Sequence, residues 1–236
     1  MKVLVIVPAF NEAMNIESVV EDICRATDQI DYMVINDCST DDTRRILAEK
    51  RLNYIDLPIN LGIGGCVQTG FRYADDNNYD IAVQFDGDGQ HDAKFIERLI
   101  RPILNNEANV VIGSRFIECE GFQSSYARRF GINAISNLIY VLSGVKVYDV
   151  TSGMRAYDRC MIKYLAKNYE DDYPEPDALL AAALMKMKIQ EVSVQMRERK
   201  GGKSSINFKR SIYYMVKVCS SLLLMKLMST WKGNVK

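Results

Sequence analysis

The first half of the chain alternates between short, almost continuous apolar runs and stretches whose apolar residues recur at helical spacing. Short apolar runs bounded by polar loops predict buried strands, and apolar residues every three or four positions predict amphipathic helices. The expected strands cover 3–7, 32–35, 53–57, 81–85 and 110–112, and the expected helices cover 16–26, 43–50, 65–74 and 95–104. This rhythm predicts an α/β fold, with a single Rossmann-like, mostly parallel sheet covered by helices on both faces.

The alternation ends after about residue 115. A long helix is predicted over 126–142, a turn with short extended pieces over 148–157, a helix over 176–187 and a strand over 190–196. The last forty residues are rich in Leu, Met and Tyr and predict one or two helices. The second half therefore differs in character from the first.

Polar residues follow three of the predicted strands. Pro8 to Glu12 follow the first, Asn36 and Asp37 end the second, and Asp86 to Gln90 follow the fourth. In open α/β sheets, ligands bind beyond the carboxyl ends of the strands. We therefore expect a ligand site at this edge.

Asp86 and Asp88 flank a glycine directly after a buried strand, and Gln90 adds a further oxygen. Carboxylates this close repel one another unless a cation lies beside them. Hard oxygen ligands suit Mg²⁺ or Mn²⁺, which can also bind substrate phosphates and neutralise a diphosphate leaving group. The competing interpretation is an ordinary Asp-Gly turn.

Three further features lie near these loops. Asp37, at a strand tip, could accept a hydrogen bond from a nucleobase, whereas Ser39 or Asp41 could simply cap the next helix. The glycine-rich stretch 60–65 lacks dinucleotide-loop spacing and favours a close backbone approach to a ligand or a helix. His91, the single histidine, has either a positioning or a structural role.

Composition narrows the class of protein. The 236 residues include 30 basic and 30 acidic side chains, so no overall field attracts nucleic acid. None of the six cysteines has C-x-x-C spacing, which indicates free thiols in a reducing cytoplasm. The apolar run 3–7 ends at Pro8 and is too short for a signal peptide, so we expect a cytoplasmic protein.

Six motifs occur in order along nearly the whole chain. They are P-A-F-N-E at 8–12, N-D-C-S-T-D at 36–41, D-G-D-G-Q-H at 86–91, G-S-R-F at 113–116, D-V-T-S-G-M-R at 149–155 and R-K-G-G-K-S-S at 199–205. Together they resemble glycosyltransferase family 2, and in particular its dolichol-phosphate mannose synthase-like branch of polyprenyl-phosphate glycosyltransferases. In two places the chain departs from the family pattern: Asn36 replaces an acid, and Ser205 stands where the synthases often carry Lys.

The resemblance implies a GT-A fold and an inverting transfer from a UDP- or GDP-sugar, with Mg²⁺ or Mn²⁺. It assigns Asp88 and Gln90 to the metal and Asp86 to the metal or the donor ribose, with Asp88 also catalytic. Pro8, Glu12 and Asp37 would line the nucleoside pocket. The residues that would face phosphate groups are Arg115, Arg128, Arg199 and Ser204. The full substrate-binding set that it implies is Pro8, Asn11, Glu12, Asp37, Asp86, Arg115, Arg128, Arg199, Lys203 and Ser204.

Two acceptor classes remain open. A sugar hydroxyl, as in polysaccharide biosynthesis, needs a base, for which Glu175 or Asp177 is the candidate. A polyprenyl phosphate is already an anion and needs cations more than a base. The basic residues between 197 and 210 and the apolar C-terminus favour the lipid phosphate. A noncatalytic nucleotide-sugar-binding scaffold and a nucleotidyltransferase are the alternatives outside this class.

The stretch 212–228 is strongly apolar but is interrupted by Lys217 and Lys226. Because it is short for a span of about twenty residues, an amphipathic helix lying in the membrane interface is expected. The alternatives are a helix packed on the domain and a homodimer contact. We therefore expect a catalytic domain over 1–206, a helical extension over 207–236, and a peripheral location on the inner face of the cell membrane.

Overall fold

A computed structural model describes residues 1–26, 30–118, 126–197 and 208–233. The strands are β1 (Val3–Ala9), β2 (Asp31–Asn36), β3 (Tyr54–Asp56), β4 (Ile81–Gln84), β5 (Val110–Ser114), β6 (Arg155–Asp158) and β7 (Ile189–Ser193). The helices are α1 (Ile16–Ala26), α2 (Thr43–Glu49), α3 (Gly62–Asp76), the 3₁₀ turn η1 (Ala93–Phe95), α4 (Ile96–Leu104), α5 (Tyr126–Ser143), α6 (Arg159–Leu165), α7 (Pro174–Leu184) and α8 (Phe208–Gly233).

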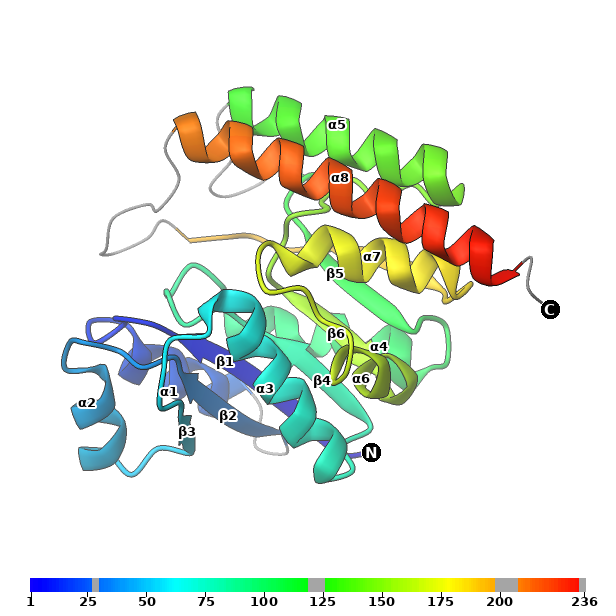
Figure 1. Ribbon diagram of the computed structural model, residues 1–236. Helices are drawn as coiled ribbons and strands as arrows, with labels where there is room; N and C mark the ends of the chain where they lie inside the picture. The colour runs from blue at the N-terminus through cyan, green and yellow to red at the C-terminus, as the bar shows by residue number, and fades with distance from the viewer. Residues whose placement is uncertain (27–29, 119–125, 198–207, 234–236) are drawn as a thin grey trace.

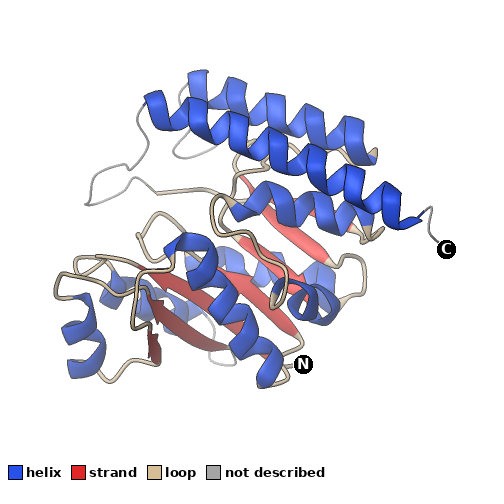
Figure 2. Ribbon diagram, viewed as in Figure 1, coloured by secondary structure: helices blue, strands red, loops and turns tan. Residues whose placement is uncertain are grey.

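In the described part of the chain, seven strands form one sheet in the order β3-β2-β1-β4-β6-β5-β7 (Figures 1 and 2). The pairs β1–β2, β2–β3, β1–β4 and β5–β7 are parallel, and only β6 runs antiparallel to its neighbours β4 and β5. The predicted α/β class with a mostly parallel sheet is therefore confirmed.

Helices cover both faces of the sheet because successive strand residues point to opposite sides. On one face, Val5 and Val7 of β1 pack in a core cluster with α1, α2 and α4. On the other face, Leu4 and Ile6 pack in a second cluster with α3, α5, α6, α7 and α8. Every residue of β1 is buried, as expected for a central strand of a covered parallel sheet.

α5 and α8 lie side by side as an outer layer over α7 (Figure 1). Val218 and Leu222 of α8 are buried in the same cluster as α5 and α7, so α8 packs on the main body. The opposite side of α8 is exposed and apolar. The predicted division at residues 206 and 207 stays a prediction, because it lies outside the described residues.

The sequence pattern did not predict β6 as a strand of the sheet. It predicted only short extended pieces there, because four residues beginning with an arginine do not look like a buried strand. Arg155 is nevertheless fully buried, and it pairs with Gln84 of β4 and Ile112 of β5. Because β6 is antiparallel, the loop that precedes it, residues 149–154, lies at the carboxyl edge where β4 and β5 end.

Candidate active site

The loops after β1 and β2 are joined by Asn11. Its Oδ1 accepts hydrogen bonds from the backbone N–H groups of Thr40 (2.8 Å) and Asp41 (3.3 Å), and its own N–H donates to Ser39 Oγ (3.0 Å). Asn11 has a left-handed backbone (φ 58°), which asparagine tolerates better than most residues. Asn11 therefore holds two loops of the site together, and its contact with substrate stays a prediction.

Asp37 is buried directly after β2, where it organises the start of α3. Its Oδ1 accepts the Leu61 N–H at 2.7 Å, and its carbonyl accepts Asn60 Nδ2 at 3.0 Å. Burial raises its pKa, although the nearby N–H groups of Leu61 and Gly62 act in the opposite direction. The structure thus explains the glycine-rich stretch as a helix start that is held against Asp37.

Asp86, Asp88 and Gln90 follow β4 at the carboxyl edge of the sheet. Asp88 Oδ1 accepts the Gln90 N–H at 3.0 Å, which closes a tight turn. Although 34% of the Asp86 side chain is exposed, its dense protein surroundings raise its pKa to about 7, and the charge of Asp88 adds to this shift. Glu12 of the first loop also raises this pKa, so the structure brings Glu12 into the electrostatic range of Asp86.

His91 lies directly behind this acidic centre. Its Nε2 is 3.5 Å from Asp86 Oδ2, and its ring packs edge-on against Phe85. Burial lowers its pKa to about 4, so the ring is neutral at neutral pH. Its Nδ1 has no hydrogen-bond partner among the described residues. His91 is therefore a neutral neighbour of Asp86 and brings no positive charge to the acidic centre.

Gly153 touches the acidic centre from the loop before β6. A Cβ atom at this position would lie 2.3 Å from Asp86 Oδ2, a distance that side chains do not adopt. The backbone of Gly153 is not in the left-handed region, so close approach alone requires glycine here. The carboxylate of Asp86 is thus bordered on two sides, by His91 and by the backbone at Gly153.

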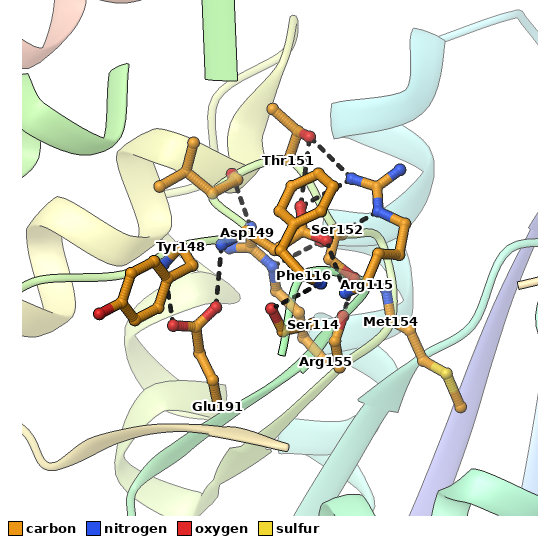
Figure 3. Close-up of polar contacts among 12 residues, drawn as sticks. Ser114, Arg115, Phe116, Tyr148, Asp149, Thr151, Ser152, Met154, Arg155 and Glu191 are labelled. Carbon is orange, nitrogen blue, oxygen red and sulfur yellow. Dashed lines mark hydrogen bonds and ion pairs between the residues drawn. The ribbon is translucent and has the colours of Figure 1, made fainter. Parts of the chain in front are cut away.

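Arg115 is held in a buried ion pair with Asp149 (Figure 3). Its Nε and Nη2 donate to the two carboxylate oxygens at 2.7 and 2.6 Å, and Nη2 also donates to Thr151 Oγ1 at 3.0 Å. Glu191 of β7 accepts the N–H groups of Tyr148 (2.8 Å) and Asp149 (2.9 Å). The motifs at 113–116 and 149–155 therefore form one network, whose planar bidentate pair fixes the loop beside the acidic centre. The predicted phosphate contact of Arg115 stays a prediction.

Arg155 connects this loop to α7. It is fully buried, and its guanidinium donates to the carbonyls of Ser152 (2.7 Å), Val150 (2.8 Å) and Glu175 (2.7 Å). Burial raises the pKa of the Glu175 carboxyl, Arg155 opposes this shift, and the charge of Asp86 increases it. Glu175 therefore belongs to the electrostatic surroundings of Asp86.

Asp177 occupies a different place from Glu175. Residues two apart on a helix point about 200° away from each other, so both cannot face one site. Asp177 is buried against α8, where its Oδ1 accepts a hydrogen bond from Ser221 Oγ, and burial raises its pKa to about 6. It lines a cavity of about 260 Å³ with Tyr164 and Met225. Of the two predicted candidates for a base, Glu175 is the one whose pKa is raised by the charge of Asp86, and the role of either as a base stays a prediction.

The remaining predicted residues are placed as follows. Pro8 is buried at the end of β1, and its carbonyl accepts the Gly87 N–H at 3.2 Å. Arg128, in the first turn of α5, is exposed to solvent, yet the protein atoms crowded around it and, less strongly, the charge of Arg115 lower its pKa. The Arg197 N–H donates to the Gln90 carbonyl at 2.8 Å. Arg199, Lys203 and Ser204 lie outside the described residues.

The acidic centre fits a divalent cation. Two carboxylates share a turn, and burial together with the nearby charge of Asp88 raises the pKa of Asp86, so a cation between them would be stabilising. Within the described ranges, no group of three or more His, Cys, Asp or Glu side chains could hold a metal ion by itself. A site of this kind suits Mg²⁺ or Mn²⁺, which are often held by one or two carboxylates together with water and substrate phosphates.

The sheet order and the acidic loop after β4 define a glycosyltransferase of GT-A fold. The model of glycosyl transferase family 2 matches residues 4–166, and the chain belongs to this family. It is 30% identical, over 82% of this chain and 84% of the other, to UDP-N-acetylglucosamine–dolichyl-phosphate N-acetylglucosaminyltransferase from Methanococcus voltae. It is 26% identical, over 88% of each chain, to undecaprenyl-phosphate mannosyltransferase from Micrococcus luteus.

A similar solved structure is glucosyl-3-phosphoglycerate synthase from Mycobacterium tuberculosis in complex with Mn²⁺, UDP-glucose and phosphoglyceric acid. The two folds superpose with a TM-score of 0.74, at 19% identity, over 95% of this chain and 79% of that chain. At this identity the likeness shows the fold alone. The predicted family, fold and transferase activity are confirmed.

Several residues of the site were not predicted from the sequence. Asp149, Gly153 and Arg155 lie in a motif that carried the family resemblance, but neither spacing nor composition indicates that Gly153 touches Asp86. Glu191 lies in a predicted strand and gave no signal. Their roles come from long-range contacts, which only the folded chain brings about.

Proposed function

We propose that this protein is an inverting, metal-dependent transferase that moves a sugar from a UDP- or GDP-sugar onto a polyprenyl phosphate at the cytoplasmic face of the membrane. The observation that carries the proposal is the acidic pair Asp86 and Asp88 at the edge where the loops of β1 and β2 meet, with His91 and Gly153 against Asp86. The names of the polyprenyl-phosphate relatives support the acceptor class.

Asp86 and Asp88, with Gln90 beside them, would hold Mg²⁺ or Mn²⁺, which supplies positive charge to the diphosphate leaving group. The chain's own residues do the rest. Asp37 and the start of α3 bind the nucleoside side of the donor. The Arg115–Asp149 pair keeps the loop at 149–153 in place, so the carboxylate of Asp86 stays where the donor needs it.

The acceptor sets the chemistry that is required. A phosphate acceptor attacks without losing a proton. Glu175 then does not act as a base and contributes only its charge. A sugar hydroxyl would need a base, and Glu175, whose pKa is raised by burial and less strongly by the charge of Asp86, is the candidate. This raised pKa makes a saccharide acceptor the second candidate. Asp177 faces α8 and serves neither reaction.

The discriminating experiment compares wild type with Glu175→Gln, using labelled donor and either a short polyprenyl phosphate or a saccharide acceptor. For a lipid phosphate, label enters the organic phase and the variant stays within about tenfold of wild type. For a sugar hydroxyl, no lipid product forms and the variant loses roughly 10²–10⁴ in rate. Asp177→Asn is the matched control, since it removes a charge two residues away. Donor binding without transfer or hydrolysis would indicate a noncatalytic scaffold. Release of pyrophosphate from a nucleoside triphosphate would indicate a nucleotidyltransferase.

We also propose that α8 contacts the membrane surface as a peripheral element. The described residues contain no helix that is long and apolar enough to cross a bilayer. The outward side of α8 instead exposes large apolar side chains, namely Tyr213, Val216, Leu223, Leu224, Leu227 and Met228. Such a contiguous apolar surface is typical of a lipid or protein contact.

Vesicle flotation tests this contact. Wild type should float with vesicles of anionic lipid, and Leu224→Glu with Leu227→Glu should stay in the soluble fraction. The matched control is Leu104→Glu, which changes an exposed leucine on α4, a helix of the opposite face of the sheet. A wild-type homodimer that becomes monomeric in the double variant, without vesicle binding, would make α8 a subunit contact.

A further inference from the structure

The segment 170–173, between α6 and α7, touches the start of α3. The Gly64 N–H donates to the Asp171 carbonyl at 3.0 Å. A Cβ atom on Gly64 would lie 2.0 Å from the Glu170 carbonyl oxygen and 2.4 Å from that of Asp171. Gly64 is not in the left-handed region, so only the close approach of this segment requires glycine. The segment therefore packs directly against the first turn of α3, and Asp37 contacts the same turn through the Leu61 N–H.

The same segment leads directly into the start of α7, which carries Glu175. Tyr173 is the N-cap of α7 and has a left-handed backbone (φ 56°, ψ 53°), which is strained for an aromatic residue and persists only where the surroundings enforce it. Two residues later, the carbonyl of Glu175 accepts from Arg155 at 2.7 Å. The position of Tyr173 therefore fixes where α7 begins and where Glu175 lies.

α8 supports the segment from outside. The rings of Tyr173 and Tyr214 pack edge-on, with centroids 4.5 Å apart and planes at 74°. Asp172 also pairs with Lys217 at 2.5 Å, but both side chains are substantially exposed, so this pair contributes little. The ring pair is half-buried, so it contributes more to the contact between α8 and the segment than this exposed ion pair does.

We propose that Tyr173 and Tyr214 are positioning residues that couple the packing of α8 to the donor site. Through the ring pair, α8 holds the segment 170–173, which in turn holds the start of α3 at Gly64 and the start of α7 at Glu175. That the ligand bound beside Asp37 and the start of α3 is a nucleotide sugar rests on the proposed function. Because such coupling is reciprocal, donor binding also favours the docked position of α8.

Tyr214→Ala tests this coupling, since Tyr214 lies on α8 outside the acidic centre. The probes are UDP and GDP with Mn²⁺, titrated by calorimetry, and kcat and KM for the donor. We expect the nucleotide Kd and the donor KM to rise about 5-fold or more, in the range of typical couplings, and Tyr214→Phe to restore both. Leu222→Ala, which removes buried packing of α8 two turns further on, should lower the melting temperature but leave the Kd within about twofold.

Hydrogen exchange gives a second reading that needs no ligand. The amides of residues 61–65 should exchange roughly tenfold faster in Tyr214→Ala than in Tyr214→Phe. If Tyr214→Ala does not fold, Tyr214→Leu keeps an apolar side chain without the ring edge and replaces it. The coupling would be overturned if the Tyr214 variants exchanged these amides and bound nucleotide as wild type does. It would also be overturned if Leu222→Ala weakened nucleotide binding as much as Tyr214→Ala. An inactive wild type whose exchange still responds to Tyr214 would instead contradict the proposed function alone.

Discussion

The two halves of the molecule build the candidate site in different ways. Before residue 115, each functional side chain follows its own strand, and the parallel arrangement of β2, β1 and β4 brings the three loops to one edge. After residue 126, the contributing groups lie in the loop before β6, on β6, on α7 and on β7, and buried polar contacts such as Arg115–Asp149 hold them in place. The first half carries the acidic pair and Asp37, and the second half carries the contacts at Gly153 and Arg155 that surround them.

This difference teaches that a substitution should act according to its half. In the first half, removing a charged group should remove chemistry or donor affinity while the fold persists. In the second half, changing a contact should displace groups that remain chemically intact. The four predictions that follow run from the largest expected effect to the smallest.

Asp88→Asn should abolish transfer. The amide oxygen can still accept the Gln90 N–H, so the turn persists, but the charge that would hold a metal is gone. We expect a loss of several kcal/mol in transition-state stabilisation, roughly 10³-fold or more in kcat. Initial rates with and without excess EDTA measure it, and the melting temperature confirms folding. Full activity in the variant, or in wild type with EDTA, contradicts this role.

Gly153→Ala should impair the enzyme from the second half without removing a functional group. The added methyl must displace Asp86 Oδ2 or the loop at 149–153, and misplacement by about 1 Å costs roughly 10²-fold in rate. The matched control is Gly131→Ala in α5, whose Cβ meets only the flexible Met215 Sδ at 3.2 Å. Similar kcat values for the two variants would remove Gly153 from the acidic centre.

Asp37→Asn should weaken donor binding and leave turnover of bound donor nearly unchanged. Its oxygen can still accept the Leu61 N–H, so the start of α3 is kept, but the charged acceptor for the base is lost. A charge-assisted hydrogen bond contributes about 1.5–3 kcal/mol, which corresponds to roughly 10- to 100-fold in donor KM. Asp42→Asn, at an exposed N-cap that makes no side-chain capping bond, is the control. An unchanged KM would place the base elsewhere.

Asp177→Asn should leave activity unchanged and make the protein more stable at pH 7. The folded pKa of about 6 lies above the ordinary value of 3.8, so the folded state binds this proton more tightly than the unfolded state. Below pH 4 the carboxyl is protonated in both states of the wild type, so it costs no folding stability. As the pH rises from about 4 to 6, ionisation of the buried carboxyl lowers the free energy of unfolding, and above that range the full loss is present. The variant should gain about 1–3 kcal/mol at pH 7, with no gain at pH 4.

Urea unfolding at pH 4 and pH 7 measures this difference. Ser221→Ala is the companion variant, since Ser221 donates to the charged carboxylate and its loss should lower stability at pH 7. A loss of stability in Asp177→Asn at pH 7 would mean that the carboxylate is stabilised where it lies.

The amino-acid sequence by itself determined the first half of the protein. Continuous apolar runs such as 3–7 can be buried only in a covered sheet, and the polar residues after them must then meet at its carboxyl edge. The predicted pair Asp86 and Asp88, and Asp37 at the end of β2, lie where this logic places them. Local pattern is sufficient there because strand, loop and functional group are contiguous in the chain.

The tertiary structure alone decided the second half of the site. A buried arginine such as Arg155 does not resemble a strand residue, and the antiparallel direction of β6 follows from packing between β4 and β5 rather than from its four residues. Helical phase, which requires the register of α7 against α8, directed Asp177 toward Ser221 of α8. Gly153 and Gly64 are required by neighbours 67 and 106 positions away, Asp86 and Glu170. No local pattern encodes such contacts, because their energies exist only once the chain has folded.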